Sequence, residues 1–211
     1  MKLFFHYCPF SFSNCYILGT EFAADIDPCA DAPREALVID PSYMDETVLN
    51  FIENNEYHIR AVLITHDHRN HVRGLRTLKR IYDTEIYAVN HTIGEHKTTL
   101  IRDGDVFNIG PFCVEVISVP GHSADSVVFK INHLLFTGDA LSAGLVGRTA
   151  SSYGATIQIT ALRNKILPLP GDYTVLPGHG PPSSLEAERR FNAGIQIYEQ
   201  KKNQRPRFTR L

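Results

Sequence analysis

Side chains that bind metal ions are concentrated in one short stretch of this chain. Residues 65–71 read THDHRNH, which places His66, His68 and His71 directly after the apolar run of residues 61–64. An apolar run bounded by polar, non-periodic residues predicts a buried strand that delivers a loop. Imidazoles at a strand end can converge on one point, and neutral imidazole is the commonest metal ligand in proteins. The stretch therefore predicts a metal site.

Three later turns carry further potential ligands, each just past an apolar run. Their sequences PGH, TGD and PGH contain His122, Asp139 and His179. Glycine lets the backbone turn sharply and brings the next side chain close to its neighbours. A single histidine after a strand is usually structural, but this repetition predicts that the three side chains complete the site. The other histidines lack this context and are expected to be ordinary polar residues: His6, His58, His91, His96 and His133.

Hydrophobic patterning predicts the elements that position these ligands. Short apolar runs separated by turn residues predict strands over residues 3–7, 14–18, 36–39, 61–64, 85–89, 105–109, 112–119, 126–130, 134–137 and 173–176. Apolar residues at helical spacing predict helices over residues 45–56, 71–82, 155–166 and 184–201. We expect Ser183 or Ser184 to cap the last helix. The two similar halves predict two packed sheets with helices on their outer faces.

In their order along the chain, these motifs closely resemble those of the metallo-β-lactamase superfamily and, within it, the glyoxalase II-like (hydroxyacylglutathione hydrolase-like) hydrolases. The family motif T-H-x-H-x-D-H-x-x-G is matched by residues 65–74, and the other matching segments are residues 14–16, 38–41, 120–123, 136–139, 147–149 and 176–181. The resemblance implies an α/β protein with the four-layered αββα sandwich, in which the metal site lies at one edge of two mixed sheets. It also implies one domain over residues 1–211, without the C-terminal helical domain with which glyoxalase II grips glutathione.

Carried over to this chain, the resemblance implies two metal positions. The first position would be formed by three histidines and the second by two, with one aspartate bridging them: His66, His68 and His122, then His71 and His179, with Asp139 between. The aspartate of the family motif is replaced by Asn70. A neutral amide is a poorer ligand for a hard cation than a carboxylate. We therefore expect one firmly bound ion and a second that is weaker or absent.

Asn70 and Asp67 lie in the same loop as the three histidines. The amide of Asn70 can offer its carbonyl oxygen to a metal or hold a metal-bound water by hydrogen bonding. Asp67 lies between two presumed ligands, and in an extended backbone its side chain points away from them. We expect Asp67 to be a surface residue or a partner of a ligand.

The implied activity is that of a metal-dependent hydrolase. Zinc is the expected ion, with iron as the alternative, and the ion would convert a bound water into hydroxide. Asp139 would orient the hydroxide and take up its proton, so that it attacks a thioester or a related small acyl substrate. Two alternatives stay open: a mononuclear iron enzyme resembling persulfide dioxygenases, which would use His66, His122 and Asp139, and a metal-binding protein with impaired catalysis.

Composition and charge indicate which classes of partner the protein lacks. The 211 residues carry a formal net charge of −2, with no basic groove that would suit nucleic acid. No apolar stretch reaches the roughly 18 residues that a membrane span needs, and the N-terminus does not read as a signal peptide. The four cysteines form no C-x-x-C pair, so we expect reduced thiols in a cytoplasmic protein. The oligomeric state is left open.

Further predictions concern two cysteines, three candidate substrate contacts, the basic C-terminal residues and the loops. Cys15 and Cys113 lie in apolar runs and are expected in the core. Tyr16, Arg148 and Tyr153 are expected to be structural, with substrate contact as the alternative. The basic residues near the C-terminus are expected to form a solvated tail: Lys201, Lys202, Arg205, Arg207 and Arg210. The loops over residues 20–35, 141–153 and 181–184 are the expected pocket lining.

Overall fold

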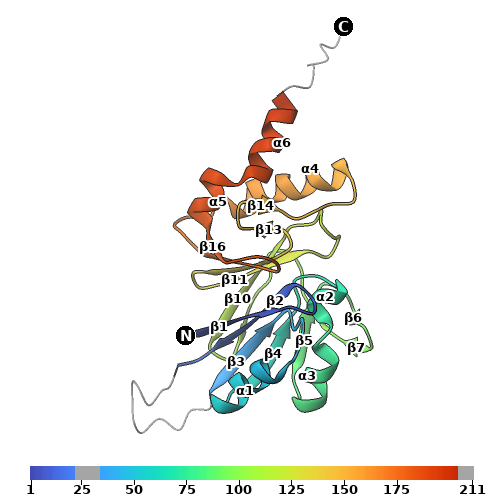
Figure 1. The fold of residues 1–211 in the computed structure, drawn as a ribbon, viewed down its shortest axis with the longest axis vertical. Coiled ribbons are helices and arrows are strands. Elements are labelled where there is room, and N and C mark those ends of the chain that lie inside the picture. Colours follow the sequence, from blue (N-terminus) through green and yellow to red (C-terminus); the bar gives the residue numbers. More distant parts are fainter. Residues whose placement is uncertain (22–33, 204–211) are drawn as a thin grey trace.

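Two six-stranded mixed sheets lie face to face in the computed structural model, which describes residues 1–21 and 34–203 (Figure 1). The first sheet contains, in spatial order, β1 (Lys2–Cys8), β2 (Ser13–Gly19), β3 (Glu35–Ile39), β4 (His58–Leu63), β5 (Glu85–Ala88) and β8 (Thr99–Leu100). The second contains β16 (Ser183–Ser184), β15 (Thr174–Pro177), β12 (Leu134–Gly138), β11 (Val127–Ile131), β10 (Phe112–Ser118) and β9 (Val106–Ile109). Two small hairpins are β6 (Thr92–Ile93) with β7 (His96–Lys97), and β13 (Leu141–Ser142) with β14 (Leu145–Val146).

The central strands are apolar on both faces because both faces are covered. In β3, Leu37 and Ile39 pack toward the second sheet, whereas Ala36 and Val38 pack toward the helices. This alternation follows from the two-residue period of a strand. Continuous apolar runs of this kind are the reason that the central strands could be predicted from the sequence.

Helices cover the outer face of each sheet (Figure 1). The helices on the first sheet are α1 (Glu46–Asn54), α2 (Arg69–Val72) and α3 (Leu75–Ile81), and those on the second are α4 (Ser152–Ala161), a π-helical turn η2 (Leu162–Ile166) and α5 (Leu185–Phe191). Helix α6 (Ala193–Asn203) follows α5 and projects away from the sandwich. Val48 and Ile52 of α1 pack on the first sheet, and Leu162 and Leu185 pack on the second. The αββα sandwich implied by the resemblance is therefore confirmed.

The helix predicted over residues 71–82 is two helices, so that prediction is wrong. The chain turns at Arg73 and Gly74, between α2 and α3. Gly74 donates its backbone N–H to the carbonyl of Pro41 at 2.7 Å, and a Cβ at this position would lie 2.6 Å from the same oxygen. A contact between distant parts of the chain thus overrides a continuous helical pattern.

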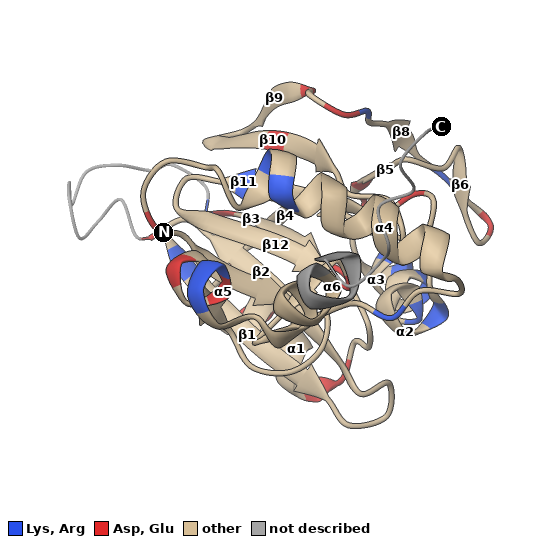
Figure 2. Ribbon diagram, turned by 90° about the horizontal axis from the view of Figure 1, so that it is seen from above, with Lys and Arg blue, Asp and Glu red and all other residues tan. Residues whose placement is uncertain are grey.

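The closing helix predicted over residues 184–201 is also broken. Ser184 caps α5 as expected, accepting from the Ala187 amide at 3.1 Å. The helix then ends at Asn192. The side-chain oxygen of Asn192 accepts from the Ile195 amide at 3.1 Å and so caps the next helix, α6. Figure 2 shows acidic and basic residues side by side on α5, where Glu186 pairs with Arg189 at 3.2 Å.

Of the two cysteines expected in the core, one is buried and one is exposed. Cys15 is buried as expected, but Cys113 is exposed, because its neighbours Phe112 and Val114 occupy the core-facing side of β10. Within the described residues, no helix has the length and apolar character that crossing a membrane requires. The basic side chains near the C-terminus and most of the loop over residues 20–35 lie outside the described part of the chain.

Candidate metal centre

The candidate ligands gather at one edge of the sandwich because strand direction brings them there. His66 and His68 follow β4 of the first sheet, and α2 continues that segment. In the second sheet β10, β12 and β15 run in the same direction, and the turns after their last residues carry the other three ligands: His122, Asp139 and His179. The Val127 amide donates to the Thr65 carbonyl at 2.9 Å, which joins the two sheets beside the site.

Four ligand atoms converge at the first position. His68 Nδ1 lies 3.0 Å from His66 Nε2 and 2.9 Å from His122 Nε2. Asp139 Oδ2 lies 3.3 Å from His122 Nε2 and 3.9 Å from His66 Nε2. Four ligands at tetrahedral bond lengths of about 2.0–2.2 Å are separated by about 3.3–3.6 Å. The spacing of these atoms is thus close to that of a metal coordination shell.

A second group shares Asp139. His71 Nε2 lies 3.3 Å from Asp139 Oδ1, and His179 Nε2 lies 3.5 Å from Asp139 Oδ2. Asn70 is also in this group, because its Nδ2 lies 2.9 Å from His179 Nε2. The structure therefore brings together all six side chains that the resemblance implied as ligands, together with Asn70.

Hydrogen bonds on the outer side of four imidazoles determine which nitrogen is free. Each Nδ1 faces an oxygen acceptor: His66 faces Thr65 Oγ1 at 3.1 Å, His71 faces Asp40 Oδ2 at 3.1 Å, His122 faces the Arg148 carbonyl at 2.6 Å, and His179 faces the Phe12 carbonyl. In the neutral, metal-binding form of each ring we therefore assign the proton to Nδ1. This leaves the Nε2 lone pairs directed into the site, the arrangement that orients metal-ligating histidines.

Asp40 was not identified as a functional residue from the sequence, although it is central to this outer layer. It is 2% exposed and accepts from the Thr65 amide at 2.8 Å and the Thr65 hydroxyl at 2.6 Å, in addition to His71. Its position directly after a buried apolar strand is the signal that could have identified it, since Asp139 follows β12 in the same way.

Burial and charge set the protonation of the first position. Burial, together with the nearby His71, lowers the pKa of His66 to about 4. Burial and His122 lower the pKa of His68 as well. Burial alone would raise the pKa of Asp139, but the neighbouring imidazoles of His179 and His71 hold it well below its usual range. Neutral imidazoles and an anionic carboxylate are the forms that bind a metal.

The second position attracts positive charge more strongly. Burial works against protonation of His71, yet the two carboxylates of Asp139 and Asp40 raise its pKa to about 9. The Asp139 carboxylate, which lies 3.5 Å from His179 Nε2, likewise raises the pKa of His179. His71 Nε2 and Asp139 Oδ1 are buried and have no hydrogen-bond partner. A cation between these atoms would satisfy both, so the residues present fit a metal ion.

Close packing at the site explains one of the glycines. A Cβ at Gly178 would lie 2.4 Å from His71 Cε1 and 2.5 Å from Asp139 Oδ1. Any side chain there would displace two of the candidate ligands. The glycine of the second PGH turn is therefore required by the approach of this turn to the ligands.

Comparison with known proteins agrees with this geometry. The sequence profile of the metallo-beta-lactamase superfamily matches residues 8–179. The chain belongs to the metallo-β-lactamase superfamily. The hydroxyacylglutathione hydrolase GloC of Haemophilus influenzae is 27% identical over 198 residues, covering 82% of this chain and 93% of that protein.

Two other similar proteins bear on the identity of the metal. A probable polyketide biosynthesis zinc-dependent hydrolase, BaeB of Bacillus velezensis, is 26% identical over 214 residues, covering 92% of this chain and 90% of the relative. The crystal structure of TTHA1623 in a di-iron-bound form superposes with a TM-score of 0.69 at 25% identity, covering 86% of this chain and 94% of that one. Relatives with zinc and with iron are therefore both similar to this chain.

The remaining candidates lie outside the ligand groups of this metallo-β-lactamase fold. Asp67 is exposed, and its backbone amide donates to the Asp125 carboxylate at 2.8 Å. Tyr16 is 2% exposed, so its ring is structural. Arg148 contributes its carbonyl to His122, and the side chain of Tyr153 is 75% exposed. Among the described residues, none of the five other histidines joins either ligand group.

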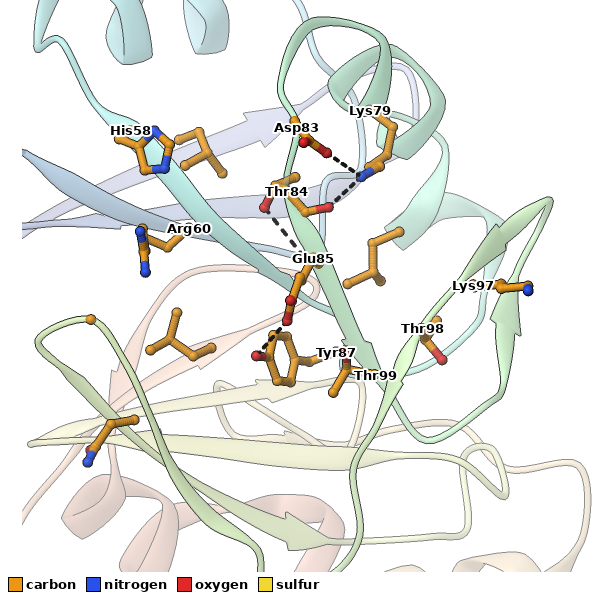
Figure 3. A pocket seen from close by; sticks show the side chains of 15 residues that line it. His58, Arg60, Lys79, Asp83, Thr84, Glu85, Tyr87, Lys97, Thr98 and Thr99 are labelled. Atoms are coloured by element: carbon orange, nitrogen blue, oxygen red, sulfur yellow. Dashed lines mark hydrogen bonds and ion pairs between the residues drawn. The ribbon is translucent and has the colours of Figure 1, made fainter.

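A separate groove of about 740 Å³ lies at the edge of the first sheet (Figure 3). Several of its charged groups have partners within the groove: Lys79 contacts Asp83 at 3.9 Å, and Glu85 accepts from the Tyr87 hydroxyl at 2.9 Å. The groove contains none of the candidate ligands.

Proposed function

We propose that this protein is a metal-dependent hydrolase that cleaves thioesters or related small acyl compounds. The observation that carries the proposal is the convergence of three imidazole nitrogens and the Asp139 carboxylate at one position. The relatives named as hydroxyacylglutathione hydrolase and zinc-dependent hydrolase support the same reaction class. Zinc is the proposed ion, with iron as the alternative.

The residues of the first position have distinct roles in this proposal. Three histidines and Asp139 would hold a divalent ion, which would supply acidified water and polarisation of the substrate carbonyl. His66 and His68 bind in the neutral form that their lowered pKa values favour. Asp139, anionic at neutral pH, accepts a hydrogen bond from the attacking water and orients it toward the carbonyl carbon.

Asn70 makes the second position weaker in this proposal. With the His179 proton on Nδ1, the Asn70 amide donates to His179 Nε2 at 2.9 Å and uses the lone pair that an ion would need. An ion at the second position must break this hydrogen bond and gains no charge from the amide. We therefore propose one tightly bound ion per chain.

The test is reconstitution of metal-stripped protein with zinc or iron(II), followed by assay on a panel of acyl-glutathione and acyl-coenzyme A thioesters. We expect one equivalent of zinc to restore hydrolysis, and we expect Asp139→Asn to lose about 10²-fold or more. His133→Ala, which changes an exposed histidine outside the site, is the matched control and should retain activity.

Two outcomes would overturn the proposal. Oxygen uptake with a glutathione persulfide by the iron form, without thioester hydrolysis, would establish the dioxygenase alternative. Stable metal binding with neither activity would establish a metal-binding protein whose catalysis is lost.

A further inference from the structure

The turn that carries His179 is held by hydrogen bonds from another sheet. Residues 177–180 leave β15 of the second sheet, yet three of their carbonyls accept from β2 of the first sheet. The donors are Asn14 and Tyr16, which belong to the early segment, residues 14–16, that the sequence resemblance included.

Asn14 makes most of these contacts and is completely buried. Its Nδ2 donates to the carbonyls of Pro177 and Gly180, each at 2.8 Å, and its backbone amide donates to Gly178 at 2.8 Å. A buried amide that satisfies the carbonyls of a tight turn restricts the positions the turn can adopt.

Tyr16 adds a second bond to the same turn. Its hydroxyl donates to the Pro177 carbonyl at 2.6 Å, and its ring packs edge-on against Phe136 at 5.5 Å between centroids. Burial raises the pKa of Tyr16, so the hydroxyl keeps the proton that it donates.

The same hairpin also contacts the side chain of His179 and the backbone of Asn70 at the second position. The Phe12 carbonyl accepts from His179 Nδ1, and the Ser13 hydroxyl donates to the Asn70 carbonyl at 2.6 Å. Phe12 has a φ of +53°, an uncommon conformation for a residue other than glycine. The hairpin backbone is therefore constrained where it contacts the site.

We infer that Asn14 and Tyr16 are positioning residues that hold the His179 turn, and that through this turn the β1–β2 hairpin sets the affinity of the second metal position. The hairpin makes no hydrogen bond to His66, His68 or His122 among those of the described residues. The effect should thus be confined to the second position. The inference rests on the proposed binding of metal at these ligands.

The metal test compares Tyr16→Phe with Tyr57→Phe, each in the wild-type chain and together with Asn70→Asp, which supplies the missing carboxylate. Tyr57 is the matched control because its hydroxyl donates to the Thr20 carbonyl at 3.2 Å, away from the site. We expect Tyr16→Phe to lower the affinity for the second zinc ion by about threefold to tenfold, since one hydrogen bond is lost, and to leave the affinity for the first ion unchanged. Asn14→Ala, which removes two side-chain donors, should weaken the second ion further.

A second readout needs no metal. The Gly178 amide donates to the Gly138 carbonyl at 2.7 Å, so its hydrogen exchange reports on the turn. In metal-free protein we expect faster exchange of this amide in Tyr16→Phe and unchanged exchange in Tyr57→Phe.

The outcomes separate the inference from the proposed function. Unchanged exchange at Gly178, or equal weakening of both ions by Tyr16→Phe, overturns the inference. Faster exchange at Gly178 without any second ion, even after Asn70→Asp, shows that the hairpin holds the turn but contradicts its role in metal affinity. Absence of both ions and of hydrolysis in every form contradicts the proposed function itself.

Discussion

Asp40 shows how a single buried residue can organise a metal centre without binding the metal. Its carboxylate accepts three hydrogen bonds, from the Thr65 amide and hydroxyl and from His71 Nδ1. These bonds orient His71 directly and His66 through the Thr65 hydroxyl. A carboxylate that accepts from the outer nitrogen of a ligand also fixes its tautomer.

Asp40→Asn should therefore destabilise the metal-free protein. Asparagine tolerates the φ of +48° found at this position, so the backbone is preserved. The amide nitrogen would, however, face a buried donor, which costs about 1–3 kcal/mol of unfolding free energy. Urea denaturation measures the change.

Asp45→Asn provides the control for Asp40. Asp45 caps α1 by accepting from the Val48 amide at 3.0 Å, and asparagine caps helices equally well. Asp45 also faces His6 Nε2 at 2.9 Å, so we expect a change of up to about 1 kcal/mol, smaller than that of Asp40→Asn. Equal effects of the two substitutions would contradict the role assigned to Asp40.

At the scale of elements, the tight turns after β12 and β15 bring the ligands together. Gly178→Ala should displace His71 and Asp139, because the added methyl group would lie within 2.5 Å of both. We expect a loss of about 1–3 kcal/mol in unfolding free energy and a clear loss of bound metal. Calorimetry and metal analysis of the purified variant measure the two effects.

Gly180→Asn is the control in the same turn. Gly180 has a φ of +78°, and a Cβ added there would have no atom within 4 Å. Asparagine adopts this backbone conformation more readily than most residues. Metal content should be retained. If Gly180→Asn and Gly178→Ala lose metal equally, the turn is sensitive to any substitution and the steric explanation is wrong.

Most strands and all six candidate ligands could be identified from the sequence. Three ligands cluster directly after an apolar run, and the other three follow glycine turns at the ends of such runs. The breaks at Gly74 and Asn192 could not be predicted. Gly74 approaches the Pro41 carbonyl, which lies far away in the sequence, and Asn192 ends one helix by capping the next. Local periodicity contains no information about the first of these contacts.

The hydrogen-bond acceptors that orient the ligand histidines could not be predicted from the sequence either. The Phe12 and Arg148 carbonyls orient His179 and His122. Because every residue has a backbone carbonyl, residue type does not indicate which carbonyl acts as an acceptor. Asp40 lies 25 residues from Thr65 and 31 from His71, so its partners became apparent only in the fold.

At the scale of the whole molecule, the candidate ligands join the two sheets. His66 and His68 come from the first sheet, and His122 and Asp139 come from the second. A metal held by all four binds the folded state but has no preformed site in the unfolded chain. Bound metal should therefore stabilise the entire sandwich.

Removing the metal with a chelator should lower the melting temperature. An ion present at about 1,000 times its dissociation constant contributes about 4 kcal/mol, which corresponds to a shift of about 10 °C for a chain of this size. His122→Ala should show a much smaller shift between metal-loaded and stripped protein, because one ligand is missing. A large, undiminished shift in this variant would place the ion elsewhere.

The central claim is that the first position binds an ion tightly and that Asn70 weakens the second. Zinc titration against a competing chelator tests it most directly, with wild type and Asn70→Asp measured side by side. The account predicts one tight ion per chain in the wild type and a second, newly tightened ion in Asn70→Asp. Two equally tight ions in the wild-type protein would contradict it.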